Sequence, residues 1–311
     1  GDSQESIIGA LKIIAAKLIG KNTADFEELL LSIQNSVVNN TSAKAALDIA
    51  LHDLVAKSMH QPLYKFLGGG KPELKILTTV SVKAVAEMVE DAQLFVAQGF
   101  ETLKIKVGLN PAEDIQRLKA IREAVGDSIN ILSDANQGWD AKSALQIIAS
   151  LAVHNLGIAM VEQPVKAWDY ANLKYVRDNS RIPIYADESA FNLRDVSKII
   201  QAQMADGINI KLMKSGGLYA ARPIYDLATS HNLPCMAGCM LESPIGLAAM
   251  AAFVVGKSNI KFVDLDPIAM IKSNPVVGGV RLDGATLHLS TGAGLGIENI
   301  QGLIPVVTIG A

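Results

Sequence analysis

The chain has 311 residues, of which 50% are hydrophobic, 5% aromatic and 19% charged. This apolar content is sufficient for a large core and excludes disorder as the main state. The 28 lysines and arginines are outnumbered by 31 acidic residues, giving a net charge of −3. The chain therefore lacks the cationic surplus of a dedicated nucleic-acid binder, and we expect no nucleic-acid partner.

The cysteine content and the hydropathy pattern indicate a reducing, cytoplasmic location. Cys235 and Cys239 form neither a CxxC pair nor a disulfide framework. The sequence contains no apolar run of about 20 residues and no signal peptide, so we expect no membrane partner. The chain begins with Gly1 rather than Met, and we expect that a preceding piece is absent from this numbering.

The first part of the chain is predicted to be helical. Residues 5–19 form an amphipathic pattern, residues 24–37 a weaker one, and residues 43–59 place apolar side chains on one helix face. The helical pattern ends before Pro62 and a run of three glycines.

Between residues 76 and 276, short β-branched runs alternate with helical patterns. The runs are TTVSV, TLKIKVG, INILSDAN, IAMVEQP, IPIYADES, GINIKLM, LPCMAGC and FVDLD. Their number matches the eight strands of a closed parallel barrel. Polar residues follow nearly every run, as expected when all strand ends surround one site. An open doubly wound sheet is the competing architecture, but it places its ligand at one switch point.

The last part of the chain, residues 277–311, is different again. It holds two strand-like pieces, GGVRLDG and TLHLS, and a GAGLGI loop. These pieces predict a return of the chain to a second domain.

Three consecutive strand ends carry a carboxylate: Asp134, Glu162 and Asp187. A single carboxylate at such a position is commonly a helix cap or a loop charge. Because neighbouring strands lie about 5 Å apart, three adjacent ends can also converge on one point. Three oxygen ligands from separate strands suit Mg²⁺, and the lack of His or Cys beside them argues against zinc. The spacing leaves both interpretations open.

Three lysines interrupt apolar strands. Strand alternation puts Lys104 and Lys106 on one face, toward the barrel mouth. Lys211 ends the sixth run, which lies across an eight-stranded barrel from the second. Although lysines are usually solvated surface residues, two facing ammonium groups would lower each other's pKa and make one lysine usable as a general base. Lys214 is interpreted as the start of the following loop.

The last run ends with Asp264 and Asp266 in the segment FVDLDP. Strand alternation puts both carboxylates on one face. They fit either a turn before Pro267 or a pair that holds a substrate ammonium group.

The order of these motifs resembles the muconate-lactonizing subgroup of the enolase superfamily over essentially the whole chain. The motifs are KIK, SDAN, VEQP, ADES and NIKLMKSGG, and the DLD segment is similar to the DxD motif of dipeptide epimerases. The resemblance implies a modified (β/α)7β TIM-type barrel at residues 76–276 and an α+β capping domain. Residues 1–75 would be the helical remainder of that domain, and residues 277–311 would return to it. The family's N-terminal β-meander, with a loop that closes over the substrate, would precede this numbering.

The resemblance also implies roles for the motif residues. Asp134, Glu162 and Asp187 would bind one Mg²⁺ per subunit, which stabilises the enediolate formed when the α-proton leaves. Lys106 and Lys211 would stand on opposite faces of the α-carbon, one removing the proton and the other returning it.

Further implied roles concern the substrate. Lys104 would help to neutralise the substrate carboxylate, while Asp264 and Asp266 would bind the free amino group. The implied pocket-lining residues are Thr79, Cys239 and Met240, and the implied supporting residues behind the metal ligands are Asn136 and Glu188.

The resulting prediction is a homo-oligomeric, Mg²⁺-dependent dipeptide epimerase. It would act by 1,1-proton transfer on the C-terminal residue of L-Ala-Glu dipeptides from murein turnover. The alternatives within the subgroup are an o-succinylbenzoate synthase, a muconate cycloisomerase and an N-acylamino acid racemase, whose substrates carry no free ammonium group for Asp264 and Asp266. A catalytically dead relative that acts as a binding subunit is a further alternative, against which the intact lysines and carboxylates argue.

Overall fold

In the computed structural model, which describes residues 2–306 and 308, the first part of the chain folds into helices, as predicted. Ser3 caps the first helix, because its hydroxyl accepts the Ser6 N–H at 3.2 Å. The helices pack through a core of their own, in which Ile14 and Ile33 are fully buried. Their bounds are α1 Gln4–Ala16, α2 Phe26–Asn35, α3 Thr41–Ser58 and α4 Leu63–Phe66.

The middle of the chain forms one eight-stranded parallel sheet whose strand order follows the sequence. Every predicted run supplies one strand. The strands are β2 Thr78–Val80, β3 Thr102–Lys106, β4 Asn130–Asp134, β5 Ile158–Glu162, β6 Ile184–Ala186, β7 Gly207–Ile210, β8 Cys235–Ala237 and β9 Ile260–Val263. The ends of the curled sheet meet where the Leu77 N–H donates to the Val263 carbonyl at 2.9 Å.

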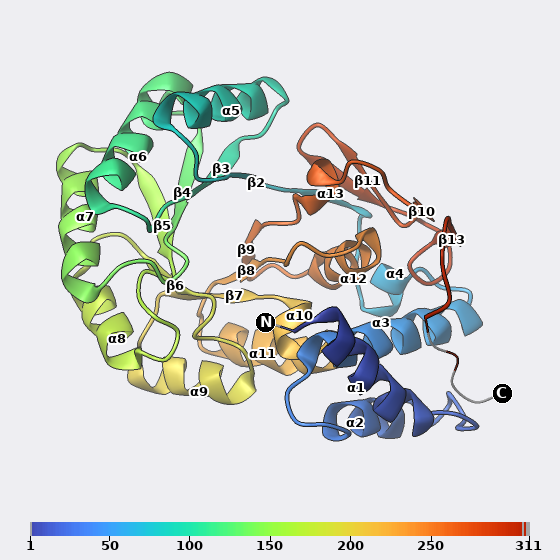
Figure 1. Cartoon of the computed structure of the whole chain (residues 1–311). Helices are drawn as coiled ribbons and strands as arrows, with labels where there is room; N and C mark the ends of the chain where they lie inside the picture. Colours follow the sequence, from blue (N-terminus) through green and yellow to red (C-terminus); the bar gives the residue numbers. More distant parts are fainter. Residues whose placement is uncertain (1, 307, 309–311) are drawn as a thin grey trace.

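Each interval between consecutive strands of this sheet contains a helix, which gives the predicted (β/α)7β pattern. The helices are α5 Val85–Ala97, α6 Pro111–Val125, α7 Ala141–Val153, α8 Tyr170–Asn179, α9 Leu193–Ala202, α10 Leu212–Ser215, α11 Leu218–Ser230 and α12 Pro244–Val254. Helices α5 to α9 follow one another along the outer side of the sheet (Figure 1). The fold class expected from the sequence, an α/β barrel with a cap, is therefore confirmed.

The end of the chain lies against both other parts. It consists of α13 Pro267–Met270, β10 Val276–Gly278, β11 Val280–Asp283, β12 Thr286–Leu289 and β13 Ile297–Ile300. Strand β12 pairs with β11 and with β1 (Glu73–Lys75), and β10 pairs with β13. The Leu63 N–H donates to the Gly294 carbonyl at 2.6 Å, which joins this segment to α4. The domain boundaries at residues 75 and 276 remain a prediction.

Asp48 of α3 joins the cap to the barrel. Its fully buried carboxylate accepts the N–H groups of Leu218 at 2.7 Å and Tyr219 at 3.2 Å, in the first turn of α11. Gly217, which precedes this helix with a φ of 113°, has no side chain to cap it, and a Cβ there would overlap the Asp48 carboxylate. The N-terminus of a barrel helix is therefore capped by a residue of the helical cap.

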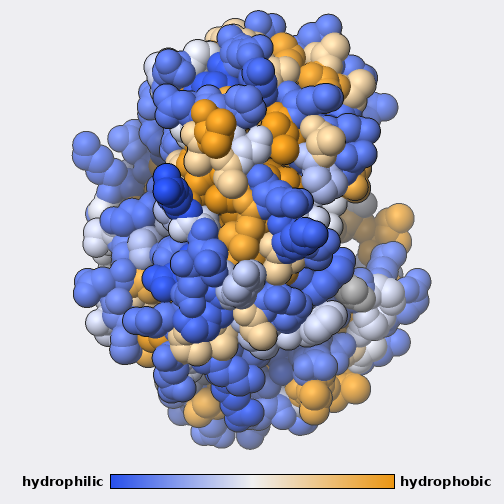
Figure 2. All heavy atoms as spheres, turned by 90° about the vertical axis from the view of Figure 1, so that its left-hand side faces the viewer, coloured by the Kyte–Doolittle hydropathy of each residue, from blue (hydrophilic) through white to orange (hydrophobic). Residues whose placement is uncertain are grey.

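The outer surface is mixed in character. The side on the left of Figure 1, where α6, α7 and α8 lie, is mostly hydrophilic with a hydrophobic strip in its middle (Figure 2). None of the helices in the described residues combines the length and the apolar character needed to cross a membrane.

Candidate active site

The three predicted carboxylates lie together at the C-terminal ends of neighbouring strands. In the strand register Lys106 of β3 is level with Asp134 of β4, which is level with Glu162 of β5. Asp187 follows the end of β6, and each of the three carboxylates is at most 1% exposed. Two residues earlier on these strands, alternation places an apolar core of Leu132, Met160 and Tyr185, to which Leu77 and Met236 also belong. The carboxylates therefore form the polar layer above that core.

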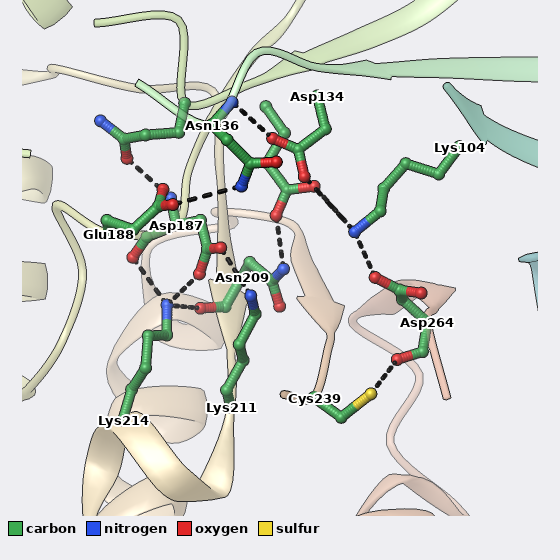
Figure 3. A network of polar contacts seen from close by, with 12 residues as sticks. Lys104, Asp134, Asn136, Asp187, Glu188, Asn209, Lys211, Lys214, Cys239 and Asp264 are labelled. Atoms are coloured by element: carbon green, nitrogen blue, oxygen red, sulfur yellow. Dashed lines mark hydrogen bonds and ion pairs between the residues drawn. The ribbon is translucent and has the colours of Figure 1, made fainter. Parts of the chain in front are cut away.

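Lys104 and Lys106 point to the same side of the sheet, as alternation predicts. The Lys106 ammonium lies 2.7 Å from the Asp134 carboxylate. The Lys104 ammonium lies 3.5 Å from the same carboxylate (Figure 3). Lys104 also lies 3.5 Å from the Glu162 carboxylate and forms an ion pair with Asp264. Burial would lower the pKa of Lys104, but Asp264 and the two other carboxylates raise it well above its ordinary value.

Lys211 approaches the same cluster from β7. It is the residue before the short helix α10, and its ammonium lies 2.7 Å from Asp187 Oδ2. The prediction that a facing ammonium group lowers the pKa of Lys211 is wrong. Burial does lower it, but Asp187 and Glu162 outweigh this effect and raise the pKa above its ordinary value. The nearest charges are carboxylates, not the opposite lysine.

The carboxylates differ in their protonation. Burial would raise the pKa of Asp134, but Lys104 and Lys106 hold it below its ordinary value. Lys214 and Lys211 overcome burial in the same way and lower the pKa of Asp187. Burial and the nearby Asp134 raise the pKa of Glu162 to about 7. Of the three carboxylates, Glu162 is the one to which no ammonium group donates a hydrogen bond, and it loses its proton at the highest pH.

The donor set fits a divalent ion. Glu162 Oε1 accepts the Asn209 amide at 2.5 Å, while Glu162 Oε2 is buried and has no hydrogen-bond partner. Within the described residues, no three Asp, Glu, His or Cys side chains hold a metal-binding arrangement as they stand, and ammonium groups pair with Asp134 and Asp187 instead. Three carboxylates at adjacent strand ends, one of which keeps an oxygen that accepts no hydrogen bond, are the hard oxygen ligands that Mg²⁺ prefers.

The two aspartates after β9 lie beside Lys104. Asp264 pairs with Lys104 through Oδ2, and its Oδ1 is buried without a partner. Asp266 accepts the Thr79 N–H at 2.6 Å, and burial together with Asp264 raises the pKa of Asp266 to about 6. The structure thus brings Thr79 and both aspartates to one side of the mouth, where Asp264 Oδ1 is free to accept a hydrogen bond.

The remaining predicted site residues occupy the rim of the same mouth. The Cys239 thiol donates to the Asp264 carbonyl at 3.2 Å, and burial raises the pKa of this thiol well above its ordinary value. Met240 is 41% exposed. Asn136 accepts a hydrogen bond from the Lys106 ammonium at 2.7 Å and donates one to Glu188 at 3.3 Å, so Asn136 connects the lysine to the other predicted supporting residue.

Two residues of the site were missed by the sequence reasoning. Lys214 does not begin an exposed loop: it is 1% exposed, and its ammonium donates to Asp187. Gln163, also fully buried, accepts the N–H groups of Asp187 and Ser189 at 3.0 Å. The sequence held a signal for each, because Gln163 lies inside the motif VEQP and Lys214 inside the motif NIKLMKSGG.

Glu242 is a third residue of the site that the sequence patterns did not single out. It follows β8 in the segment GCMLES, and its Oε2 is buried without a hydrogen-bond partner. Its carboxylate folds back over Gly246, in the first turn of α12. Burial raises the pKa of Glu242 to about 8, against a smaller opposing effect of Lys211.

Comparisons with known proteins agree with this geometry. Residues 87–301 match the family described as enolase C-terminal domain-like, and residues 1–68 match the N-terminal domain of the mandelate racemase/muconate lactonizing enzymes. The L-Ala-D/L-Glu epimerase of Clostridium acetobutylicum is 44% identical over 97% of this chain and 84% of its own length.

Solved structures show the same similarity. A substrate-liganded complex of the L-Ala-D/L-Glu epimerase from Bacillus subtilis is 42% identical and has a TM-score of 0.94, covering 96% of this chain and 84% of its own. A dipeptide epimerase from Enterococcus faecalis, complexed with Mg and the dipeptide L-Leu-L-Tyr, is 38% identical with a TM-score of 0.92 over the same shares. The chain therefore belongs to the mandelate racemase/muconate lactonizing enzymes of the enolase superfamily, and it is an isomerase whose relatives are dipeptide epimerases.

Proposed function

We propose that the chain is a Mg²⁺-dependent epimerase that inverts the α-carbon of the C-terminal residue of dipeptides. One observation carries the proposal. Lys106 from β3 and Lys211 from the end of β7 reach the same cluster of carboxylates from strands four positions apart in the barrel. A substrate carboxylate bound at that cluster would have its α-carbon between the two lysines.

The two lysines would perform the proton transfer. One of them, as the neutral amine, takes the α-proton, and the other, as the ammonium ion, gives a proton to the opposite face. Each lysine ends in the state that the reverse reaction requires, so the pair serves both directions. In the ligand-free site the carboxylates hold Lys211 as the ammonium ion, which is the proton-donating state.

Asp134, Glu162 and Asp187 would hold the ion. When bound, Mg²⁺ would stabilise the negative charge that develops on the substrate carboxylate as the α-proton leaves. Lys104, 3.5 Å from two of these side chains, adds a fixed positive charge on the same side. To take up the ion, Asp134 and Asp187 must exchange lysine contacts for it.

Asp264 and Asp266 would bind the free amino group of the dipeptide. The unpartnered Oδ1 of Asp264 supports this role, since a buried carboxylate oxygen without a donor is costly until an ammonium group arrives. Cys239 fixes the backbone at Asp264, Thr79 holds Asp266, and Met240 would line the pocket at its rim.

We propose L-Ala-L-Glu and L-Ala-D-Glu as the substrate pair, with a role in murein peptide turnover and a homo-oligomeric assembly. The support is the 44% identity to an L-Ala-D/L-Glu epimerase.

The test is deuterium incorporation from D₂O. The protein with Mg²⁺ is incubated with pooled L-L dipeptides, and mass spectrometry shows which of them gain a single deuterium at the α-carbon. We expect the label in dipeptides with C-terminal Glu. N-acetyl-L-Ala-L-Glu, which lacks the ammonium group, is the matched control and should stay unlabelled. Label in the acetylated compound but not in the free dipeptides would contradict the proposal and favour an N-acylamino acid racemase.

A further inference from the structure

Lys214 is the most deeply buried cation of the barrel mouth. Its side chain is fully buried, and its ammonium donates to Asp187 Oδ1 at 2.5 Å, to the Asp187 carbonyl at 2.6 Å and to the Asn209 carbonyl at 2.8 Å. The ring of Phe191 lies 5.8 Å from the ammonium, within the range of a cation–π contact. All three donor positions of this ammonium are therefore used inside the protein.

The contacts of Lys214 determine the orientation of the Asp187 carboxylate. One ammonium group binds both the carbonyl and Oδ1 of the same residue, so the side chain cannot rotate without breaking a buried charged hydrogen bond. Oδ2 is thereby directed toward Lys211, 2.7 Å away. Gln163 fixes the backbone on the other side by accepting the Asp187 N–H.

Lys214 is also connected to Glu162, through Asn209. The Asn209 carbonyl accepts from Lys214, while the Asn209 amide donates to Glu162 Oε1 at 2.5 Å. Lys214 is thus connected to two carboxylates at once, directly to Asp187 and through one residue to Glu162. In each carboxylate the other oxygen is turned away from this support. Asp187 Oδ2 faces Lys211, and Glu162 Oε2 has no hydrogen-bond partner.

We propose that Lys214 is a positioning residue for the divalent ion, which acts by fixing the carboxylates of Asp187 and Glu162 in the orientation in which they bind it. The inference rests on the proposed function, because it takes these carboxylates as the ligands. Lys214 itself is buried against Asp187, and its effect would be exerted through that carboxylate.

The sign of the effect on metal affinity separates this role from a purely electrostatic one. An ammonium group beside a ligand repels a divalent cation, so its removal by itself would tighten binding. Loss of a residue that orients a ligand weakens metal binding instead, typically by 10–100-fold. The two explanations therefore predict opposite changes when the charge is removed.

The experiment is a Mn²⁺ titration without substrate, followed by the EPR signal of the free ion. Lys214→Met keeps the length of the side chain and removes every donor, whereas Lys214→Gln keeps one amide donor. We expect Mn²⁺ affinity to fall by about 10–100-fold in Lys214→Met and by less in Lys214→Gln. Lys44→Gln is the matched control, because Lys44 is also largely buried but forms no ion pair with Asp187 in the described residues.

The outcomes are distinguishable. Unchanged or tighter Mn²⁺ binding in Lys214→Gln, with a far-UV spectrum like that of the parent, overturns the proposal even if Lys214→Met does not fold. Equal weakening in Lys44→Gln also overturns it, because the effect would then follow from any loss of a buried lysine. Absence of Mn²⁺ binding by the unaltered protein would refute the proposed function instead.

Discussion

Glu242 allows the sharpest prediction, because its burial makes the stability of the ligand-free protein depend on pH. The carboxylate has a buried oxygen without a partner and a pKa raised from 4.5 to about 8. In the unfolded chain the group ionises near 4.5, so the folded state binds the extra proton between pH 4.5 and pH 8. Stability from this group is therefore complete below pH 4.5 and is lost as the pH rises to about 8.

The magnitude follows from linkage. At about 1.36 kcal/mol per pH unit, the loss attributable to Glu242 between pH 5 and pH 9 is about 4 kcal/mol. Glu242→Gln removes the ionisation. Any constant cost of burying the amide cancels when the two pH values are compared, so the difference in unfolding free energy between the variant and the parent should shift by up to about 4 kcal/mol in favour of the variant at pH 9.

The assay is urea unfolding of both proteins at pH 5 and pH 9, in EDTA and without substrate. Glu123→Gln, on the exposed side of α6, is the control and should leave the pH dependence of the parent unchanged. A difference between the parent and Glu242→Gln that moves by less than about 1 kcal/mol between the two pH values would refute the reasoning, since it would mean that Glu242 is hydrated or paired in solution.

Further predictions concern the reaction and the packing of the loops. Asp264→Asn should lower kcat/KM for free dipeptides by at least about 30-fold, the loss expected when one partner of a buried charge pair is removed, and a smaller effect would argue against binding of the amino group there. Lys106→Ala and Lys211→Ala should each abolish epimerisation. Each variant should still exchange the α-proton of one epimer for deuterium, and the two variants should act on opposite epimers, which NMR in D₂O can follow. Exchange of the same epimer by both variants would exclude the two-lysine arrangement. EDTA should remove the activity and Mg²⁺ should restore it, and activity that persists in EDTA would contradict the metal requirement. Gly108→Ala should lower the free energy of unfolding, measured in urea, by at least about 2 kcal/mol. The φ of +105° is unfavourable for alanine, and the added Cβ would overlap the Ala135 carbonyl. An unchanged free energy of unfolding would show that the loop after β3 adapts.

The sequence predicted the barrel because its local and long-range signals agree. Each β-branched run became one strand, and the polar residue at its end was carried to the mouth by the parallel arrangement of strands. The predicted carboxylates and lysines come together for the same reason. Alternation also placed Lys104 and Lys106 correctly, since both contact Asp134.

What the sequence did not predict depends on short-range turns and on charge balance. Lys214 was expected in a loop, but the single helical turn of α10 brings it beneath Asp187. The pKa of Lys211 was expected to be lowered, yet carboxylates surround it more closely than the other lysine does. Neither outcome follows from spacing along the chain, because each depends on which side chains meet Asp187 at the ends of the neighbouring strands β6 and β7. The roles of Met240 and the domain boundaries remain predictions.

The contact of Asp48 with the first turn of α11 has a consequence for how this molecule unfolds. The barrel helix has no cap of its own, and its terminal N–H groups are satisfied only while α3 stays in place. Detachment of the helical cap would thus leave these two N–H groups without their protein acceptor and loosen the segment that carries Lys211 and Lys214. The helical cap and the barrel would then lose their structure in one cooperative step, and a barrel fragment expressed alone would fray first at β7, the strand that leads into Lys211.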